Sequence, residues 1–134
     1  GGKWNFDADN RKPYDGAVPV PPPLTFGHDL TELHRMIQEA GIQTIGTVDA
    51  ERFAWPINRE ESLQLLDFFL QKQFAHFGTY EDALDSRHPV LFHSRLSFAL
   101  NTKMLSPLEV VKAAEAHYYQ HSEAISLPQV EGFI

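Results

Sequence analysis

The sequence contains no cysteine. Disulfides, zinc sites with cysteine ligands and cysteine-ligated iron–sulfur clusters are therefore excluded within these 134 residues. The sequence also lacks an apolar run long enough to cross a bilayer, and its N-terminus lacks the basic-then-apolar pattern of a signal peptide. We therefore expect a cytoplasmic protein with no membrane partner.

Basic residues are scarce as well. The 11 Lys and Arg residues are outnumbered by 18 Asp and Glu residues, which gives a formal net charge of −7. Affinity for DNA rests mainly on the neutralisation of phosphates by Lys and Arg, so this chain alone is poorly suited to grip nucleic acid. Its hydrophobic content of 43% is nevertheless that of an ordinary globular domain. Any basic DNA-binding surface would have to lie elsewhere in a larger protein.

The N-terminal part of the sequence has no sustained periodicity. It includes the proline-rich stretch at residues 19–23, which is typical of a stiff, polyproline-like spacer. We predict a linker over residues 1–27 and a helical domain over residues 28–134. The chain begins without Met and ends on apolar Phe133 and Ile134, so we expect it to be a piece of a longer protein.

Two longer helices are predicted from capping residues and apolar stripes. Asp29 with Glu32 forms a capping box for the first helix, which Gly41 ends. Asn58 with Glu61 opens the second, which runs to Phe77 and is apolar on most of its circumference. We expect the second helix to be central or covered by a partner. The expected buried stripe of the first helix comprises Leu30, Leu33, Met36, Ile37 and Ala40.

Shorter elements follow. Thr79 with Asp82 predicts a brief helix, and the Ser106-Pro107-x-Glu109 pattern is the strongest helix start in the sequence. Residues 127–128 are expected to be an extended exit, and residues 131–134 look like the opening of a further helix. The sequence therefore predicts an all-α fold with an extended, proline-rich lead.

Ser94 and Ser97 stand at the head of an apolar run. Ser94 is predicted to cap a helix whose first turn holds Ser97, so that hydroxyls and free backbone N–H groups point the same way. Such a helix end favours a phosphate or another anion, and Arg95 adds a formal positive charge. The alternative is that the two serines cap only their own helix.

A wider pattern contains these serines. Tyr80, then Phe92-His93-Ser94-Arg95-Leu96-Ser97, then Met104-Leu105-Ser106-Pro107 resembles the flavin-binding core of DNA photolyases and cryptochromes. That family shows a Tyr, a Thr-Ser-x-Leu-Ser segment and a Gly-x-Leu-Ser-Pro turn. Here His93 replaces the Thr and Lys103 the Gly, as in the bacterial iron–sulfur branch, the (6-4) photolyase and cryptochrome group. Also similar to that branch are residues 1–7 with 10–13, residues 55–56 before 59–61, and residues 130–134.

The resemblance implies a function for the protein to which this chain belongs. A photolyase passes an electron from reduced FAD to a pyrimidine lesion in DNA in a light-dependent reaction, whereas a cryptochrome uses the same flavin for signalling. The segment would form one wall of the FAD-phosphate site of the helical catalytic domain. The isoalloxazine contacts, the lesion pocket and any iron–sulfur cluster would come from residues after Ile134. The positions that match the family's FAD contacts are Tyr80, His93, Ser94, Arg95, Leu96 and Ser97.

Other interpretations remain open. His117 and His121 have a spacing that can hold a metal on one helix face, but Tyr118 stands where a zinc hydrolase would need Glu, so surface histidines without a metal are favoured. The proline-rich lead and the helix over residues 59–77 could instead form a protein-interaction module. A small hydrolase is poorly supported because no catalytic constellation is visible. The expected partners are damaged DNA, reached through the longer protein, and the rest of the same chain.

Overall fold

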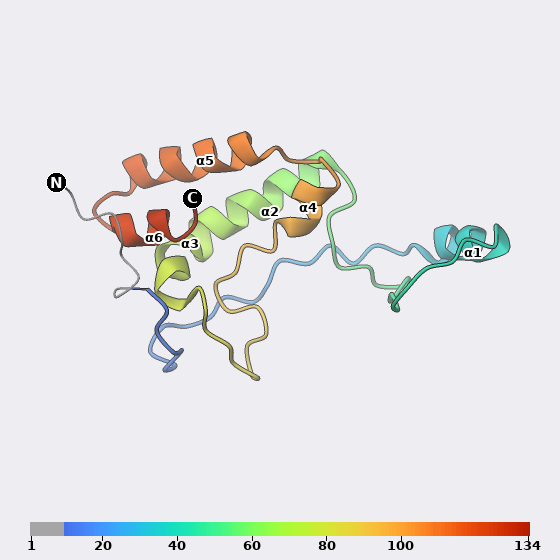
Figure 1. Ribbon diagram of the computed structural model, residues 1–134, viewed down its shortest axis with the longest axis horizontal. Coiled ribbons are helices and arrows are strands. Elements are labelled where there is room, and N and C mark those ends of the chain that lie inside the picture. Colours follow the sequence, from blue (N-terminus) through green and yellow to red (C-terminus); the bar gives the residue numbers. More distant parts are fainter. Residues whose placement is uncertain (1–9) are drawn as a thin grey trace.

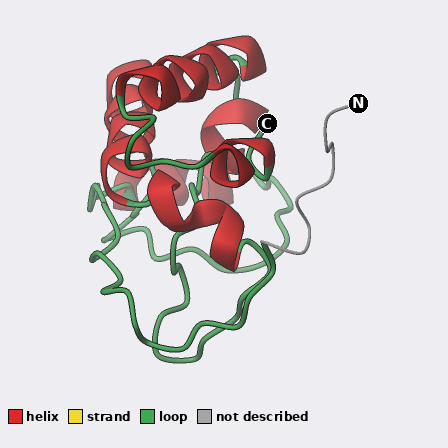
Figure 2. Cartoon of the chain, turned by 90° about the vertical axis from the view of Figure 1, so that its left-hand side faces the viewer, coloured by secondary structure: helices red, strands yellow, loops and turns green. Residues whose placement is uncertain are grey.

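The structure is a computed structural model that describes residues 10–134. Within this range it contains six α-helices, one 3-10 helix and no strand, which confirms the all-α prediction. Figure 1 shows a helical body at one end and an arm that carries α1 away from it. Figure 2 shows that loops form much of the side of the body opposite the helices. No helix of the described range is both long and apolar enough to cross a membrane.

Helix α2 (Arg59–Lys72) forms the centre of the body. Its start is as predicted, because the Asn58 side chain accepts a hydrogen bond from the Glu61 backbone N–H at 2.9 Å. The predicted single helix to Phe77 is interrupted at Gln73, whose buried side chain donates to the Leu91 carbonyl at 3.1 Å. The chain continues as α3 (Phe74–Phe77) and the 3-10 helix η1 (Gly78–Tyr80). The separate helix predicted from Thr79 and Asp82 does not form, and Thr79 belongs to η1 instead.

Helix α5 (Pro107–Gln120) lies alongside α2 (Figure 1). The predicted capping box is present, with bonds in both directions between Ser106 and Glu109. Arg59 joins the starts of the two helices: its guanidinium donates to the Glu109 carboxylate at 3.0 Å and to the Met104 carbonyl at 2.9 Å. The two longest helices are thus fixed in register at one end.

The C-terminal residues differ from expectation. Residues 127–128 are not an extended exit, since they begin α6 (Leu127–Glu131) with a proline in its first turn, where its missing N–H costs nothing. Glu131 ends this helix and does not open another. Phe133 then packs against Phe69, with ring centroids 4.8 Å apart. The last residues therefore complete the core.

The body has two groups of buried side chains. The larger unites α2, α3, α5 and α6 with α4 (Ser97–Asn101). Its buried members are Leu65, Leu66, Phe69, Leu70, Phe74, Leu96, Ala99, Leu105, Val110, Ala114, Ile125 and Val130. The smaller consists of Tyr80, Ala83, Leu91 and Phe92, packed against Tyr14, Val18 and Val20 of the lead. The proline-rich lead therefore covers one side of the body.

Helix α1 (Thr31–Glu39) forms as predicted, but its apolar side is not packed as predicted. Asp29 does not cap it: its carboxylate accepts from the Thr31 backbone N–H at 3.0 Å in a turn before the helix, while Glu32 pairs with Arg35. None of its residues is buried, and Leu33 and Met36 are 51% and 55% exposed. The predicted buried stripe is therefore not buried in this chain.

Candidate functional site

The structure brings Tyr80 to the predicted flavin-binding segment at residues 93–97. The Tyr80 ring stacks on Phe92, directly before His93, with centroids 5.3 Å apart, and the Tyr14 ring meets its edge at 5.5 Å. Burial, together with the nearby charge of Asp15, raises the pKa of the Tyr80 hydroxyl. That hydroxyl therefore remains protonated at neutral pH, and it donates to the Asp15 carboxylate. Packing of the Tyr80 and Phe92 rings, and not closeness in the sequence, brings Tyr80 to the 93–97 segment.

The predicted capping role of Ser94 is wrong. Helix α4 begins at Ser97, has Leu96 at its N-cap position and receives no side-chain cap. The reason lies in Arg95, whose φ of 58° is left-handed and turns the chain between Ser94 and the helix. The Ser94 hydroxyl instead accepts a long hydrogen bond, 3.5 Å, from the Leu96 N–H. Because α4 has only five residues, its dipole is a minor contribution to any anion site.

Arg95 points into the protein. Its guanidinium donates to the Leu24 carbonyl at 2.7 Å and lies 4.8 Å from the centre of the Trp55 ring. Trp55 in turn stacks on Phe98 of α4 at 5.7 Å. Burial lowers the pKa of Arg95, which stays charged because an arginine normally titrates far above neutrality. Arg95 thus ties the lead, the loop before α2 and the 93–97 segment together.

The same segment presents hydrogen-bond donors that the protein does not use. Within the described residues, the backbone N–H groups of Ser94, Arg95 and Ser97 have no acceptor. The Ser97 side chain is exposed, and that of Ser94 is half-buried. Leu96 is only 2% exposed and anchors the segment in the core. Hydroxyls and amides on an anchored backbone are the donor set that suits phosphate oxygens, so these residues fit the diphosphate of FAD.

His93 lies at the other edge of the segment. Its backbone N–H donates to the Val90 carbonyl at 3.0 Å, and its ring meets the edge of Phe77 at 6.2 Å. The side chain also lines a hollow of about 400 Å³ together with Asp85 and His88. A ring N–H of this imidazole can donate a hydrogen bond to an oxyanion.

His117 in the last turn of α5 and His121 at its C-cap do not both lie on the surface. His117 is only 9% exposed, whereas His121 is exposed. Their rings stack at 4.2 Å, and the His121 ring nitrogen Nδ1 bonds the His117 carbonyl at 2.9 Å. Over residues 10–134, no three His, Cys, Asp or Glu side chains are grouped to hold a metal ion. The spacing of the two histidines in the sequence gave no sign that one is buried and the other exposed.

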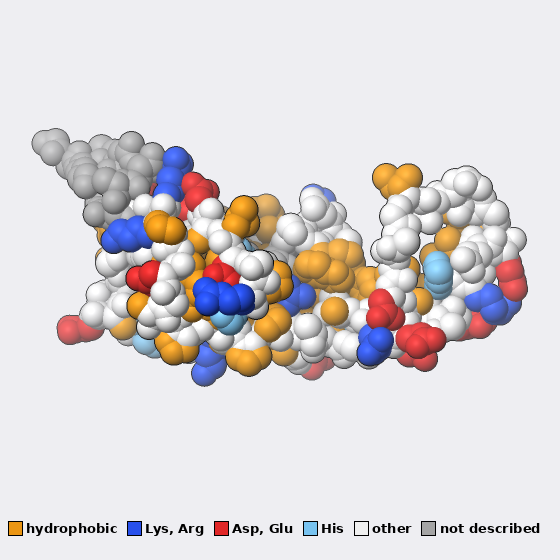
Figure 3. All heavy atoms as spheres, turned by 90° about the horizontal axis from the view of Figure 1, so that it is seen from below, with side chains coloured by type: hydrophobic (Ala, Val, Ile, Leu, Met, Phe, Trp, Pro, Cys, Tyr) orange, Lys and Arg blue, Asp and Glu red, His pale blue; other side chains and the backbone are white. Residues whose placement is uncertain are grey.

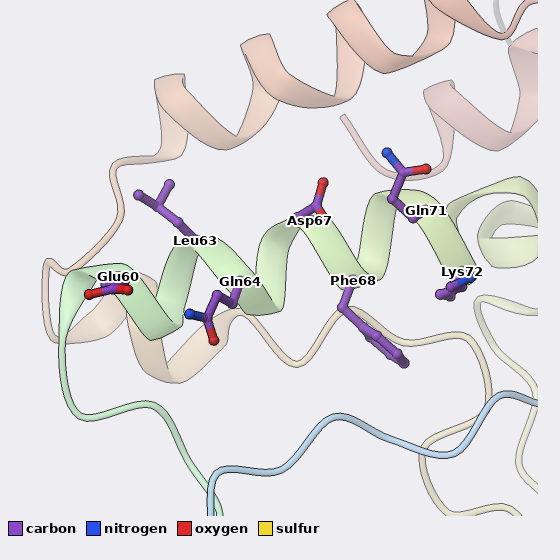
Figure 4. A pocket seen from close by; sticks show the side chains of 7 residues that line it. All are labelled: Glu60, Leu63, Gln64, Asp67, Phe68, Gln71 and Lys72. Carbon is purple, nitrogen blue, oxygen red and sulfur yellow. The ribbon is translucent and has the colours of Figure 1, made fainter.

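A shallow hollow of about 640 Å³ runs along the exposed face of α2. Figure 4 shows that all its lining side chains come from this one helix, with Leu63 and Phe68 pointing to opposite sides. The rest of the lining is polar: Glu60, Gln64, Asp67, Gln71 and Lys72. The most apolar side of α2 is covered by the chain's own core. Helix α2 therefore offers little apolar surface to an external partner.

Comparison with known proteins gives two matches. The family described as deoxyribodipyrimidine photo-lyase-related protein matches residues 1–53, of which residues 1–9 lie outside the described part of the structure. A (6-4) photolyase from Agrobacterium fabrum is 35% identical over 136 residues, which cover 100% of this chain and 26% of the relative. The chain thus spans about a quarter of the length of that relative. The two matches confirm the resemblance found in the sequence and identify this chain as a photolyase-family sequence.

Proposed function

We propose that this chain works as part of a longer, cytoplasmic, light-dependent flavoprotein of the photolyase type. Reduced FAD in such a protein passes an electron to a pyrimidine lesion in DNA. Residues 1–27 would serve as an interdomain linker, and residues 28–134 would open the helical FAD-binding domain. The observation that carries the proposal is the 35% identity to a (6-4) photolyase along the whole chain, which includes the 93–97 segment.

The residues of the proposed FAD-phosphate wall have separate tasks. The hydroxyls of Ser94 and Ser97, with the unpartnered amides of this segment, donate to phosphate oxygens. The His93 ring is a further donor at its edge, and the protonated Tyr80 hydroxyl joins it by exchanging its bond to Asp15 for one to a phosphate oxygen. Leu96 and the Arg95 side chain hold the backbone in place. Arg95 therefore contributes to the site through its position and its backbone N–H.

We assign DNA binding and any iron–sulfur cluster to residues outside this chain. With a net charge of −7, these residues do not supply the basic surface that DNA requires. The absence of cysteine means that a cluster of the iron–sulfur branch would also be ligated elsewhere. The isolated chain is expected to have no repair activity and weak or no FAD binding.

The test measures FAD content in the longer protein by visible absorption. Because neither Ser94 nor Ser97 caps a helix with its side chain, replacing both by Ala should leave folding intact and lower FAD occupancy. The exposed pair Ser122 and Ser126, replaced in the same way, is the matched control, since the Ser126 side chain makes no cap bond either. Equal FAD content in both double variants would refute the assigned wall. A folded, colourless parent would favour the interaction module.

A further inference from the structure

The arm is formed by residues 26–54 (Figure 1). Its two legs pair antiparallel at the base, where the backbones of His28 and Phe53 exchange hydrogen bonds of 2.8 and 2.9 Å. The His28 ring also contacts the Glu61 carboxylate at 2.8 Å, which fastens the base to the start of α2. Beyond this base lies α1, which buries no residue. The arm thus has a fixed attachment and an uncovered end.

The uncovered end is unusually apolar. Among residues 10–134, five of the twelve exposed large hydrophobic side chains fall within residues 33–48: Leu33, Met36, Ile42, Ile45 and Val48. A mainly apolar hollow of about 250 Å³ lies between α1 and the returning leg. Its lining consists of Leu30, Leu33, His34, Ile37, Val48, Ala50 and Phe53. A nine-residue helix is shorter than the roughly 12–15 residues that an isolated helix needs, so α1 requires a partner for its apolar face.

The charges of the arm restrict what that partner can be. Residues 26–54 hold five acidic residues and two arginines. Both arginines are paired within the arm, Arg35 with Glu32 and Glu39, and Arg52 with Asp49. In Figure 3 acidic side chains gather along one edge of the arm. Such a surface repels DNA and also repels a second copy of this acidic chain.

We propose that the arm docks onto an apolar, basic-rimmed surface supplied by the part of the same photolyase-type polypeptide that lies outside this chain. This inference rests on the proposed function. The chain covers only 26% of its (6-4) photolyase relative. A longer protein of that type would therefore have ample further surface to cover the arm. Attachment to one polypeptide gives the docking surface a high effective concentration, which favours a contact of this modest size. The acidic edge then faces the basic rim.

The test compares amide hydrogen exchange of residues 31–48 in the isolated chain and in the longer protein. Docking predicts exchange that is slower by at least about tenfold in the longer protein. Leu33→Asp should abolish this protection, because it places a charge in the apolar hollow. Ile45→Asp should have the same effect without entering the hollow, because Ile45 is fully exposed at the uncovered end of the arm. Leu84→Asp is the matched control, because Leu84 is 95% exposed and lies outside the arm.

The outcomes separate this inference from the proposed function. Protection in the longer protein that Leu33→Asp removes and Leu84→Asp retains supports docking. Equal exchange in both proteins overturns it, and so does protection of the isolated chain that grows with its concentration, which would mean a second copy. FAD absorption is recorded on the same samples. A yellow protein with an unprotected arm defeats only the docking, whereas a colourless protein with a protected arm defeats only the flavin assignment.

Discussion

The guanidinium of Arg95 lies 4.8 Å from the centre of the Trp55 ring and joins two segments that are distant in sequence. Trp55 belongs to the loop that leads from the arm into α2, and Arg95 belongs to the proposed FAD-phosphate wall. The same guanidinium bonds the Leu24 carbonyl of the lead at 2.7 Å. The geometry of the wall therefore depends on the lead and on the base of the arm.

Arg95→Ala removes both contacts and should lower the free energy of unfolding of the chain by about 2 kcal/mol. Arg95→Lys keeps the charge but not the planar contact, so it should lie between Ala and the native residue. The exposed Arg52, whose pair with Asp49 is long at 3.6 Å, supplies the control Arg52→Ala, with a much smaller expected change. Urea unfolding followed by circular dichroism measures all three. Equal losses for Arg95→Ala and Arg52→Ala would contradict the bridging role.

The sequence predicted what depends on neighbouring residues. Helix starts at Asn58 and Ser106 were predicted correctly, because a side chain and a backbone N–H within one turn decide them. The predicted cap at Ser94 is wrong, because the left-handed Arg95 separates it from α4. That backbone conformation goes with tertiary contacts of the Arg95 side chain, which no local pattern contains.

Packing was harder to predict than helix formation. The apolar stripe of α1 is present as predicted, but no part of residues 10–134 buries it. The extended exit predicted at residues 127–128 is wrong because a proline is also favourable in the first turn of a helix, and Pro128 lies in the first turn of α6. For the candidate site, the family pattern predicts that Tyr80 contributes to it. The structure adds that Tyr80 stacks on Phe92, which places it next to the 93–97 segment. The positioning role of Arg95 had no signal in the sequence.

The helix caps give a second prediction. Ser106→Ala and Asn58→Ala should each lower the free energy of unfolding by about 1 kcal/mol, because each leaves an N–H of a core helix without its acceptor. Asp29→Ala removes a similar bond before α1, and this helix buries no residue. Its effect on global unfolding should be close to zero. Chemical denaturation of the three variants decides the matter, and a full cap effect for Asp29→Ala would show that the arm unfolds together with the body.

Gly78 gives a third prediction through close backbone contact. A Cβ atom there would lie 2.8 Å from the Pro128 carbonyl oxygen and 2.9 Å from the Asn10 side chain. Gly78→Ala should therefore lower stability by about 1–3 kcal/mol, since backbone must move to relieve the contact. At Gly132 the nearest atom is the end of the Glu81 side chain, which can swing away. Gly132→Ala should therefore lower stability less than Gly78→Ala. Thermal unfolding measures both variants, and a larger loss for Gly132→Ala would contradict the close contact between Gly78 and α6.

Acid sensitivity at His117 gives the last prediction. Burial, helped by the neighbouring His121, lowers the pKa of His117, while Asp67 opposes the shift. The unfolded chain therefore binds the proton more readily, and stability is lost as the pH falls below about 6.5. His117→Phe keeps an aromatic ring against Phe74 and should make the urea midpoint less dependent on pH between about 7 and 5. Asp67→Asn should act in the opposite direction, because loss of the carboxylate lowers the His117 pKa further and increases the stability lost on acidification. Parallel pH profiles for the native chain and both variants would mean that His117 is not the group responsible.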